Sequence, residues 1–532
     1  MNVTIRRLMN TFVLFFLLVS GVAAYVQISN HAFLNGPDLT PKPDTSFLRT
    51  CPPYDQPVRG RILDRNGNVI AQSVRDPNAT CGYRREYASW VASSGLAPLI
   101  GYFSYKYGMA GIEGQYDEML SGTGPYVALN DPTRKILHQP RAGNDITLTI
   151  DKNTQILANN VYDSSAIYGN VCQPVGSRPA GSIIVEDPRS GEILAMVSRP
   201  SYDPNRIDDS NYWHQLNTDP QAPLLNHATQ AIIPPGSTFK TLTMLAGLDM
   251  GALALDTPYT FDESTNYVVN GEPIRWDDYF SGVWNGILRR SSFPLTLEQG
   301  YQYSDNVIFA RAAVKVGADT WLDYARRFGV ATPGHDSPPV PFDAPYARSS
   351  AYPATINGKP TDFSPNLLAE SGFGQGRLQI SPLTMAEITS AVAADGYLYD
   401  PHVVKSYKGS DGIQHDQPSA VPYTGGPVIH PETAQSVRHA MWSVVNHGTA
   451  WAGLFRNGAQ LRDSPTREGG KTGTAQLESG NPHAWWISLA PDDQAPGGSA
   501  AKYTITVNKE RSGEGACQVF VADDIYRSLL HV

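Results

Sequence analysis

The chain has 532 residues, more than one compact core usually holds, so two or more domains are expected. Its composition is that of a globular protein, with 41% apolar and 17% charged residues. The formal net charge of -9 excludes a uniformly basic surface and argues against nucleic acid as a partner.

An uncharged segment near the N-terminus predicts a membrane anchor. No Asp, Glu, Lys or Arg occurs between Arg7 and Asp38, and residues 11–28 are apolar and long enough to cross a ~30 Å hydrocarbon core as a helix. Arg6 and Arg7 predict that residues 1–10 form a cytoplasmic tail. The expected protein is single-pass, in the cell membrane, with the remaining chain outside the cytoplasm. The alternative is a cleaved signal peptide, since "GVAA" offers small residues for cleavage.

Four cysteines are compatible with export. Cys51, Cys81, Cys172 and Cys517 allow three pairings, and an oxidising compartment favours disulfides. None has the spacing of a zinc site, so no metal and no cofactor is expected. We predict the pairs Cys51–Cys81 and Cys172–Cys517, because each pair then stays within one predicted domain.

Two stretches with strand and turn signals organise the next part of the chain. "VRGRILDRNGNVIAQS" (58–73) predicts two short strands around an Asn-Gly turn. "GNDITLTIDKNTQILANNVYD" (143–163) predicts a strand and then a helix with Asp151 as its N-cap. We therefore place a boundary between a β-rich domain over residues 29–144 and a second domain over residues 145–532.

The second domain is predicted to be of the α+β class, with strands at both of its ends and a helix-rich middle. Residues 180–198 predict two strands joined by a Pro-Arg-Ser-Gly turn. A long Pro-rich loop covers residues 331–353. Such an order suggests a single domain that is closed by its two termini. The later strands are expected at 471–476, 484–490 and 503–508, and a last helix at 523–530.

The stretch "PPGSTFK" (234–240) places a serine and a lysine three positions apart, where the chain enters a helix. On a helix, such positions share a face with Cβ atoms ~5–6 Å apart, so Lys240 can supply the base that a serine nucleophile needs. The positive end of the helix dipole and burial both disfavour the ammonium form. Ser237 and Lys240 are therefore candidate catalytic residues.

Simpler interpretations compete with catalysis. Ser237 can be an N-cap with a solvated lysine beside it. The chain also contains a second Ser-x-x-Lys, from Ser499 to Lys502, which follows "APGG" and leads into a strand. The motif alone therefore does not establish an active site.

A second motif, "SDN" (304–306), opens the amphipathic stretch "NVIFARAAVKVG". Ser304 can pass a proton to a leaving amine, and Asn306 can bind a substrate amide. Ser-x-Asn is weak by itself, but this copy immediately precedes a convincing helix pattern. Other copies begin at Ser264, Ser364 and Ser479.

The chain's single Lys-Thr-Gly lies in "KTGTAQ" (471–476). Gly473 lets a ligand or a backbone approach an edge strand closely. Lys471 supplies positive charge, and Thr472 and Thr474 supply hydroxyls for a carboxylate. The simpler alternative is an exposed strand end.

The three motifs in this order resemble those of penicillin-binding proteins, and the chain as a whole resembles the class B members, closest to the actinobacterial kind. The resemblance extends to "RGRILDRNG", "DITLTIDKNTQ", "SYDPN", "GFGQGRLQISPLTMA" and "HAWWISLAP". It implies a β-rich pedestal (dimerisation-like) domain and a β-lactamase-like transpeptidase domain. That domain has a five-stranded, mostly antiparallel sheet flanked by helices, and an all-α subdomain.

The resemblance also implies a reaction. Ser237 would attack the penultimate D-Ala carbonyl of a peptidoglycan stem peptide, Lys240 would take its proton and Ser304 would relay it. D-Ala would leave, and an amine of a neighbouring stem would resolve the acyl-enzyme. The backbone N–H groups of Ser237 and Thr474 would form the oxyanion hole, and β-lactams would acylate the same serine.

The substrate-binding residues implied by the resemblance come from the second and third motifs. Lys471, Thr472 and Thr474 would hold the terminal carboxylate beside Gly473, and Asn306 would bind the peptide amide. About 115 residues between anchor and boundary leave room for one ordinary domain and not for an added glycosyltransferase. The implied polymerase partner is a separate membrane glycosyltransferase of the SEDS type.

Two other functions stay open. A D,D-carboxypeptidase or β-lactamase would use water as acceptor, but the sequence shows no obvious Glu to activate it. A non-catalytic β-lactam-binding regulator of a polymerase would be expected to lack part of the motif set, and all of its parts are present.

Overall fold

The structure is a computed structural model, and the predicted anchor over residues 11–28 lies outside the residues it describes. By its contacts the chain divides into Met1–Thr50 and Cys51–Val532, and all described residues belong to the second unit. No helix in this described part is long and apolar enough to cross a membrane. The described residues are 58–79, 82–122, 143–163, 178–275, 292–333, 342–345, 355–356, 359–360, 363–408, 413–416, 422, 424–450, 455–456, 459–460, 464–494 and 500–532.

Cys517 is disulfide-bonded, as expected for an exported chain. Cys51, Cys81 and Cys172 lie outside the described residues, so the pairing stays a prediction. Most of the predicted Pro-rich loop over residues 331–353 also lies outside them.

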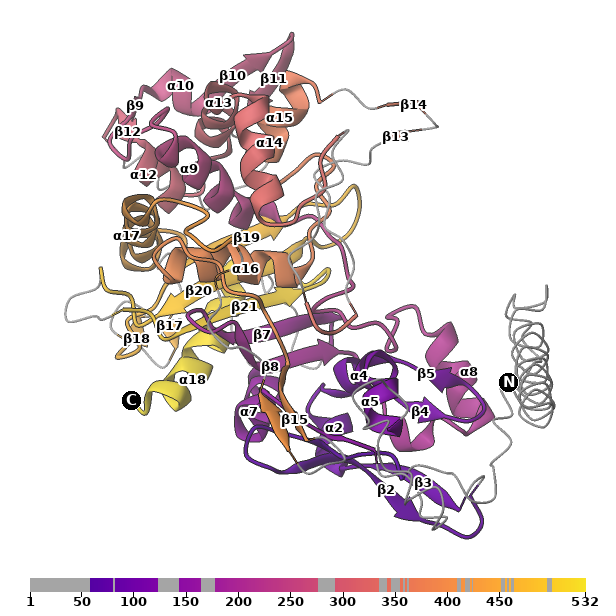
Figure 1. Ribbon diagram of the computed structural model, residues 1–532. Coiled ribbons are helices and arrows are strands. Elements are labelled where there is room, and N and C mark those ends of the chain that lie inside the picture. The colour runs from indigo at the N-terminus through magenta and orange to yellow at the C-terminus, as the bar shows by residue number, and fades with distance from the viewer. Residues whose placement is uncertain are drawn as a thin grey trace, which may run out of the picture. The chain divides into compact units, whose positions relative to one another are not determined.

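A five-stranded antiparallel sheet brings together strands from both ends of the second predicted domain (Figure 1). Its order is β19-β20-β21-β7-β8, so β19, which carries the Lys-Thr-Gly motif, is an edge strand. The predicted strand pair over residues 180–198 and the three later strands are all confirmed. Their bounds are β7 Gly181–Asp187, β8 Glu192–Arg199, β19 Gly469–Ala475, β20 His483–Ala490 and β21 Tyr503–Lys509.

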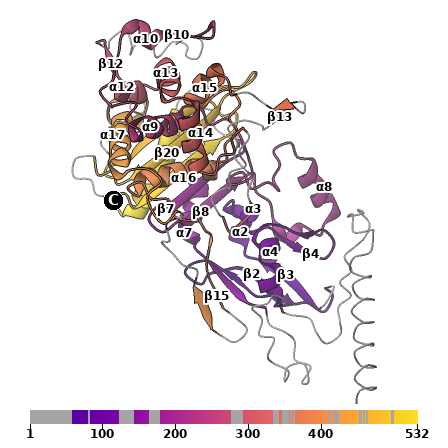
Figure 2. The same ribbon diagram turned by 45° about the horizontal axis from the view of Figure 1, so that its top comes forward.

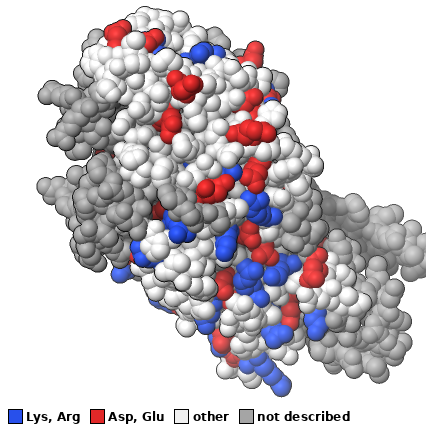
Figure 3. Space-filling view, turned by 90° about the vertical axis from the view of Figure 1, so that its left-hand side faces the viewer, with Lys and Arg blue, Asp and Glu red and all other residues white. Residues whose placement is uncertain are grey.

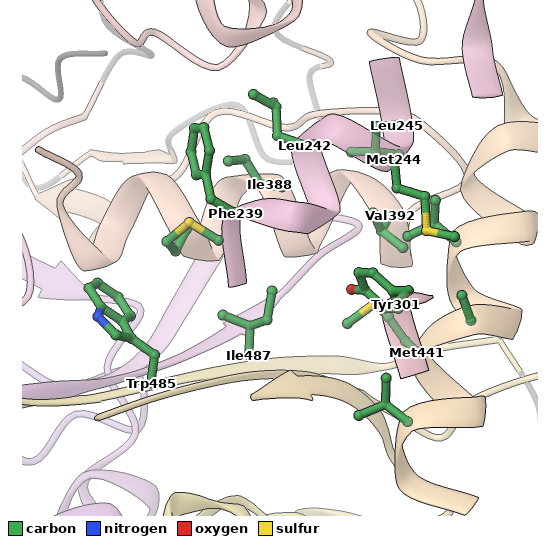
Figure 4. Packing of buried hydrophobic residues seen from close by; sticks show 14 of the residues in the cluster. Phe239, Leu242, Met244, Leu245, Tyr301, Ile388, Val392, Met441, Trp485 and Ile487 are labelled. Atoms are coloured by element: carbon green, nitrogen blue, oxygen red, sulfur yellow. The ribbon is translucent and has the colours of Figure 1, made fainter. Parts of the chain in front are cut away.

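Helices cover both faces of this sheet, so its strands are apolar on both sides. Every residue of β20 is buried. The hydroxyl of Ser488 lies 3.1 Å from that of Tyr526 on α18, whereas Trp485 and Ile487 point toward Phe239 on the opposite face (Figure 4). The covering helices are α7 (Lys152–Val161) and α18 (Val519–Leu530) on one face and α16 (Pro382–Ala393) and α17 (Pro431–His447) on the other.

The predicted helix-rich middle is confirmed, and it packs around α9 and α13 beyond α16 (Figures 1 and 2). Asp151 caps α7 as predicted, accepting a hydrogen bond from Thr154 N. The helices of this middle part are α9 (Lys240–Asp249), α10 (Phe261–Thr265), α12 (Leu297–Gln302), α13 (Asn306–Val316), α14 (Ala318–Arg327) and α15 (Pro365–Gly372), with short strands β9 (Pro258–Tyr259), β10 (Asn266–Val269), β11 (Glu272–Arg275) and β12 (Leu295–Thr296).

A second, six-stranded sheet has the order β16-β15-β6-β1-β2-β3. The predicted hairpin over residues 58–73 forms as β1 and β2. The predicted strand at the start of the second domain is β6, which pairs with β1 in parallel and with β15 in antiparallel fashion. Strands from both sides of the predicted boundary therefore complete one sheet, and the boundary itself stays a prediction. The bounds are β1 Ile62–Leu63, β2 Val69–Arg75, β3 Tyr83–Tyr87, β6 Asp145–Leu148, β15 Val404–Lys408 and β16 Gln414–Asp416.

Short helices pack against this second sheet and share an apolar core with β8, an edge strand of the first sheet, and with its neighbour β7. Ile184, Ile193 and Met196 belong to this core, whereas Ile183 and Val185 face the other one, as strand alternation requires. The remaining elements here are α2 (Ser89–Ser93), α3 (Ala97–Ile100), β4 (Phe103–Ser104), β5 (Gly108–Met109), α4 (Gly111–Gln115), α5 (Asp117–Ser121) and α8 (Ser210–Thr218).

The part of the molecule around the six-stranded sheet contains buried ion pairs. On the face shown in Figure 3, basic and acidic side chains lie among one another. Inside, the fully buried carboxylate of Glu113 accepts hydrogen bonds at 2.6 Å from both Arg59 Nε and Arg85 Nε. Burial alone would raise the pKa of Glu113, but the two guanidinium groups outweigh it and lower the pKa.

Replacing Glu113 by Ala should destabilise the protein by about 3–5 kcal/mol, because two buried guanidinium groups then lack their shared carboxylate. Urea unfolding followed by circular dichroism measures the change. Glu118→Ala, an exposed carboxylate in the next helix, is the matched control and should stay within about 0.5 kcal/mol of the parent. Equal losses in the two variants would contradict this account.

Candidate active site

Ser237 and Lys240 lie together at the start of α9. Ser237 is in a 3-10 turn, η3 (Gly236–Phe239), and the α-helix itself begins at Lys240, three residues later than the sequence suggests. The predicted proximity holds, because Lys240 Nζ lies 2.6 Å from Ser237 Oγ. Phe239 and Leu242 are fully buried and belong to the same apolar cluster as Ile388 of α16 and Ile487 of β20, which fixes the turn (Figure 4).

The turn is also held from outside by close backbone contacts. Gly236 has φ of 55° and donates its N–H to Gly374 O at 2.9 Å. A Cβ on Gly374, whose φ is 86°, would lie 1.7 Å from Gly236 O. A Cβ on Gly236 would lie 2.9 Å from Ala475 N and from Thr474 C, so the turn and β19 approach each other closely. Glycines at these positions therefore allow the backbone around Ser237 to be packed on two sides.

The "SDN" motif reaches the same lysine. Lys240 Nζ lies 2.6 Å from Asn306 Oδ1, 3.1 Å from Ser304 O and 3.3 Å from Ser304 Oγ. The predicted helix after the motif is α13, and Asp305 caps it by accepting hydrogen bonds from Val307 N and Ile308 N. Ser304 has φ of 62°, which bends the chain so that its carbonyl and hydroxyl both face Lys240.

Lys471 approaches Ser304 from the edge strand β19. Its Nζ lies 2.9 Å from Ser304 Oγ and 3.0 Å from Thr472 O. The Ser304 hydroxyl therefore sits between two lysine amines. Both lysines are 0% exposed. Burial lowers the pKa of Lys471 to about 7, and burial followed by the charge of Lys471 lowers the pKa of Lys240 well below its usual 10.5.

A cavity of about 320 Å³ opens in front of this cluster. Ser237 and two of the predicted substrate-binding residues, Asn306 and Thr474, line it, whereas Lys240, Ser304 and Lys471 lie buried behind them. The lining residues are Ser237, Asn306, Phe373, Gln375, Thr474, Gln476, Leu477, Gly480, Pro482 and Glu514.

The remaining two predicted residues lie on β19 behind the cavity wall. Gly473 provides close backbone packing, since a Cβ there would lie 2.8 Å from Thr238 Cγ2 and 3.0 Å from Pro235 O. The hydroxyl of Thr472 lies 2.6 Å from that of Thr449, and Thr472 as a whole residue is 6% exposed. The structure therefore brings all eight predicted residues to one place, in three layers: cavity wall, buried lysine cluster and supporting strand.

Sequence reasoning missed Thr449 and Glu514. Thr474 Oγ1 donates to Glu514 Oε2 at 2.8 Å, and Glu514 lines the cavity. It follows the last strand of the sheet, so its approach to Thr474 depends on a strand order that no local pattern contains. Among the described residues, no cluster of three His, Cys, Asp or Glu side chains could hold a metal ion.

Replacing Gly374 by Ala should lower the rate of covalent reaction at Ser237 by at least tenfold without unfolding the protein, because the new methyl group must displace Gly236 and the turn beside it. The rate of labelling by a fluorescent penicillin measures the loss. Gly376→Ala is the matched control. Its φ of 73° lies in the same left-handed region, but its nearest neighbour is the flexible end of Glu370 at 3.0 Å. An equal loss in both variants would mean that backbone strain at a positive φ causes the whole effect.

Sequence comparison shows matches to two family models. Residues 59–146 match the penicillin binding protein A dimerisation domain, and residues 181–525 match the penicillin binding protein transpeptidase domain. The peptidoglycan D,D-transpeptidase PbpA of Mycolicibacterium smegmatis is 28% identical over 448 residues, 81% of each chain. MrdA of Escherichia coli K12, also a peptidoglycan D,D-transpeptidase by name, is 28% identical over 433 residues, 74% of this chain and 62% of its own.

Solved structures share the fold. The penicillin G acyl-enzyme of penicillin-binding protein A from M. tuberculosis has a TM-score of 0.71 at 24% identity and covers 90% of this chain and 100% of its own. The D,D-transpeptidase domain from Eggerthella lenta has a TM-score of 0.68 at 24% identity and covers 90% of this chain and 99% of its own. Because the transpeptidase match alone spans more than half of the sequence, this chain belongs to the penicillin-binding protein transpeptidase family.

Proposed function

We propose that this protein is a peptidoglycan D,D-transpeptidase that cross-links stem peptides through an acyl-enzyme on Ser237, and that β-lactams acylate the same serine. The observation that carries the proposal is the 2.6 Å contact between the fully buried Lys240 Nζ and Ser237 Oγ at the floor of a cavity. The names of the relatives, which include peptidoglycan D,D-transpeptidases, support the same reaction.

The partners of Lys240 explain how it acts as the base. A neutral amine has two N–H bonds and one lone pair. Ser304 O and Asn306 Oδ1, at 3.1 and 2.6 Å, can only accept hydrogen bonds, so they take the two N–H groups. The lone pair is then left for the Ser237 hydroxyl, whose proton Lys240 removes as Oγ attacks the carbonyl.

Proton delivery to the leaving amine is assigned to Ser304. Its hydroxyl lies within 3.3 Å of Lys240 Nζ and 2.9 Å of Lys471 Nζ, so it can receive a proton from one and be held by the other. D-Ala then leaves, and an incoming stem amine attacks the ester in the reverse sequence. The N–H groups of Ser237 and Thr474 are proposed to stabilise the oxyanion, which the close packing of Gly236 against β19 supports.

The setting of the enzyme is part of the proposal. Residues 11–28 would anchor it in the cell membrane with residues 1–10 in the cytoplasm, and a SEDS-type glycosyltransferase would supply the glycan strands. The pedestal over residues 29–144 and the transpeptidase domain over residues 145–532 would then work outside the cytoplasm. The apolar N-terminal sequence and the dimerisation-domain match over residues 59–146 support this arrangement.

Ser237→Ala should abolish covalent labelling by a fluorescent penicillin, because the nucleophilic oxygen is removed. Mass spectrometry of the labelled parent should identify the peptide that contains Ser237. Ser499→Ala, in the chain's other Ser-x-x-Lys, is the matched control and should label normally. Labelling that survives in the Ser237 variant would disprove the assignment, and rapid loss of label from the parent would favour a hydrolase.

The second-order rate constant for acylation by penicillin should have a bell-shaped pH dependence. It should rise as Lys240 loses its proton, and this limb should lie well below pH 10.5 because burial and the charge of Lys471 lower the pKa of Lys240. It should fall as Lys471, with a pKa of about 7, loses the charge that holds the substrate carboxylate. Stopped-flow measurements across the pH range give both limbs.

Two variants separate these limbs. Lys240→Met should slow acylation by about 10²–10⁴-fold and remove the rising limb. Lys471→Arg keeps a cation at every accessible pH and should remove the falling limb. A parent rate that keeps rising to pH 10.5 would contradict the lowered pKa of Lys240.

A further inference from the structure

Glu514 is the charged member of the described cavity wall. The other lining residues are neutral, and both lysines of the cluster lie behind the wall with no exposed surface. The ion pairs found among the described residues do not include Glu514. A carboxylate that enters the cavity toward Lys471 and Thr474 therefore meets the Glu514 carboxylate, which has the same sign.

The two carboxylates would need the same proton. A threonine hydroxyl has one O–H to donate and two lone pairs to accept with. Thr474 Oγ1 donates its proton to Glu514 Oε2 at 2.8 Å and accepts the N–H of Gly515 at 3.2 Å. A substrate carboxylate that binds Thr474 must therefore take the hydroxyl proton away from Glu514.

The backbone position of Glu514 is fixed by its neighbours. Gly513 N donates to Pro482 O at 3.1 Å, and a Cβ on Gly515 would lie 2.1 Å from Gly473 O. Glu514 O accepts the N–H of Cys517 at 3.1 Å, and Cys517 is disulfide-bonded. The backbone around Glu514 is thus packed on the Lys-Thr-Gly strand, and it is the side chain that can turn away from Thr474.

We propose that Glu514 is a specificity-determining residue that occupies the carboxylate-binding hydroxyl of Thr474 in the free enzyme and must be displaced by the carboxylate of a donor peptide or β-lactam. This inference rests on the proposed function, since it names a further determinant of the same reaction. Glu514 lowers the reactivity of the site toward anionic substrates and leaves the reactivity toward uncharged ones unchanged. Acylation is thereby restricted to ligands whose carboxylate competes successfully for Thr474.

The test compares Glu514→Gln with the parent protein, using benzylpenicillin and its uncharged methyl ester as probes. Gln keeps the shape and can still accept from Thr474, but it removes the charge, and neutral hydrogen bonds are about half as strong as charge-assisted ones. The ratio of the two acylation rate constants, carboxylate over ester, should rise by about tenfold in the variant. Glu478→Gln removes an exposed charge from the neighbouring loop and should leave the ratio unchanged.

An unchanged or lower ratio in Glu514→Gln would overturn the proposal, as would an equal rise in Glu478→Gln, which would reduce the effect to general charge. A change confined to the rate at which an amine resolves the acyl-enzyme would also overturn it and place Glu514 on the acceptor side. Failure of the proposed function gives a different result, because the parent would then be acylated by neither probe. Thermal unfolding of each variant confirms that it is folded.

Discussion

The site depends on enclosing an amine inside the protein, where burial favours its uncharged form. Lys240 is fully enclosed beside a second fully enclosed lysine, and its nitrogen lies 5.9 Å from the ring centroids of Phe309 and Phe373. Burying two ammonium groups together is unfavourable, and the loss of a proton from one of them lowers this free-energy cost. The same burial that lowers the pKa of Lys240 also requires that each of its N–H groups meets an acceptor, and Ser304 and Asn306 provide them.

That requirement explains the architecture around the cluster. Ser237 comes from a 3-10 turn, Ser304 from a bend before α13, and Lys471 from the edge of a sheet, so three segments far apart in sequence converge within hydrogen-bonding distance. Close glycine contacts lock the turn to the sheet from one side, and Phe239 anchors it in the apolar core from the other. Because packing holds these three segments in place, their polar groups can act without rearranging.

Much of this could be predicted from the sequence. The strands and turns around residues 180–198 have local signals, and the motifs at Ser237, Ser304 and Lys471 predict a nucleophile, a relay and a cation by type and order. The contacts that distant segments make with these motifs could not be predicted. Gly374 contacts the turn before α9 and Glu514 contacts β19, and each contact joins segments that are far apart in the sequence. Neither residue sits in a motif whose residue types point to chemistry. The 3-10 geometry at Ser237 was missed because it depends on the Gly236 contacts.

The pairing of β15 with β6 makes the two sheets topologically inseparable. Between β6 and the later strands β15 and β16 of the six-stranded sheet, the chain forms β7 and β8 of the five-stranded sheet and the helices α7 to α16, and it then completes the five-stranded sheet with β19, β20 and β21. A single cut of the chain therefore cannot separate the strands of one sheet from those of the other. The segment that matches the dimerisation domain is therefore not an interchangeable module, because an exchange of that segment alone would have to match β15, a strand that lies in the segment matching the transpeptidase domain.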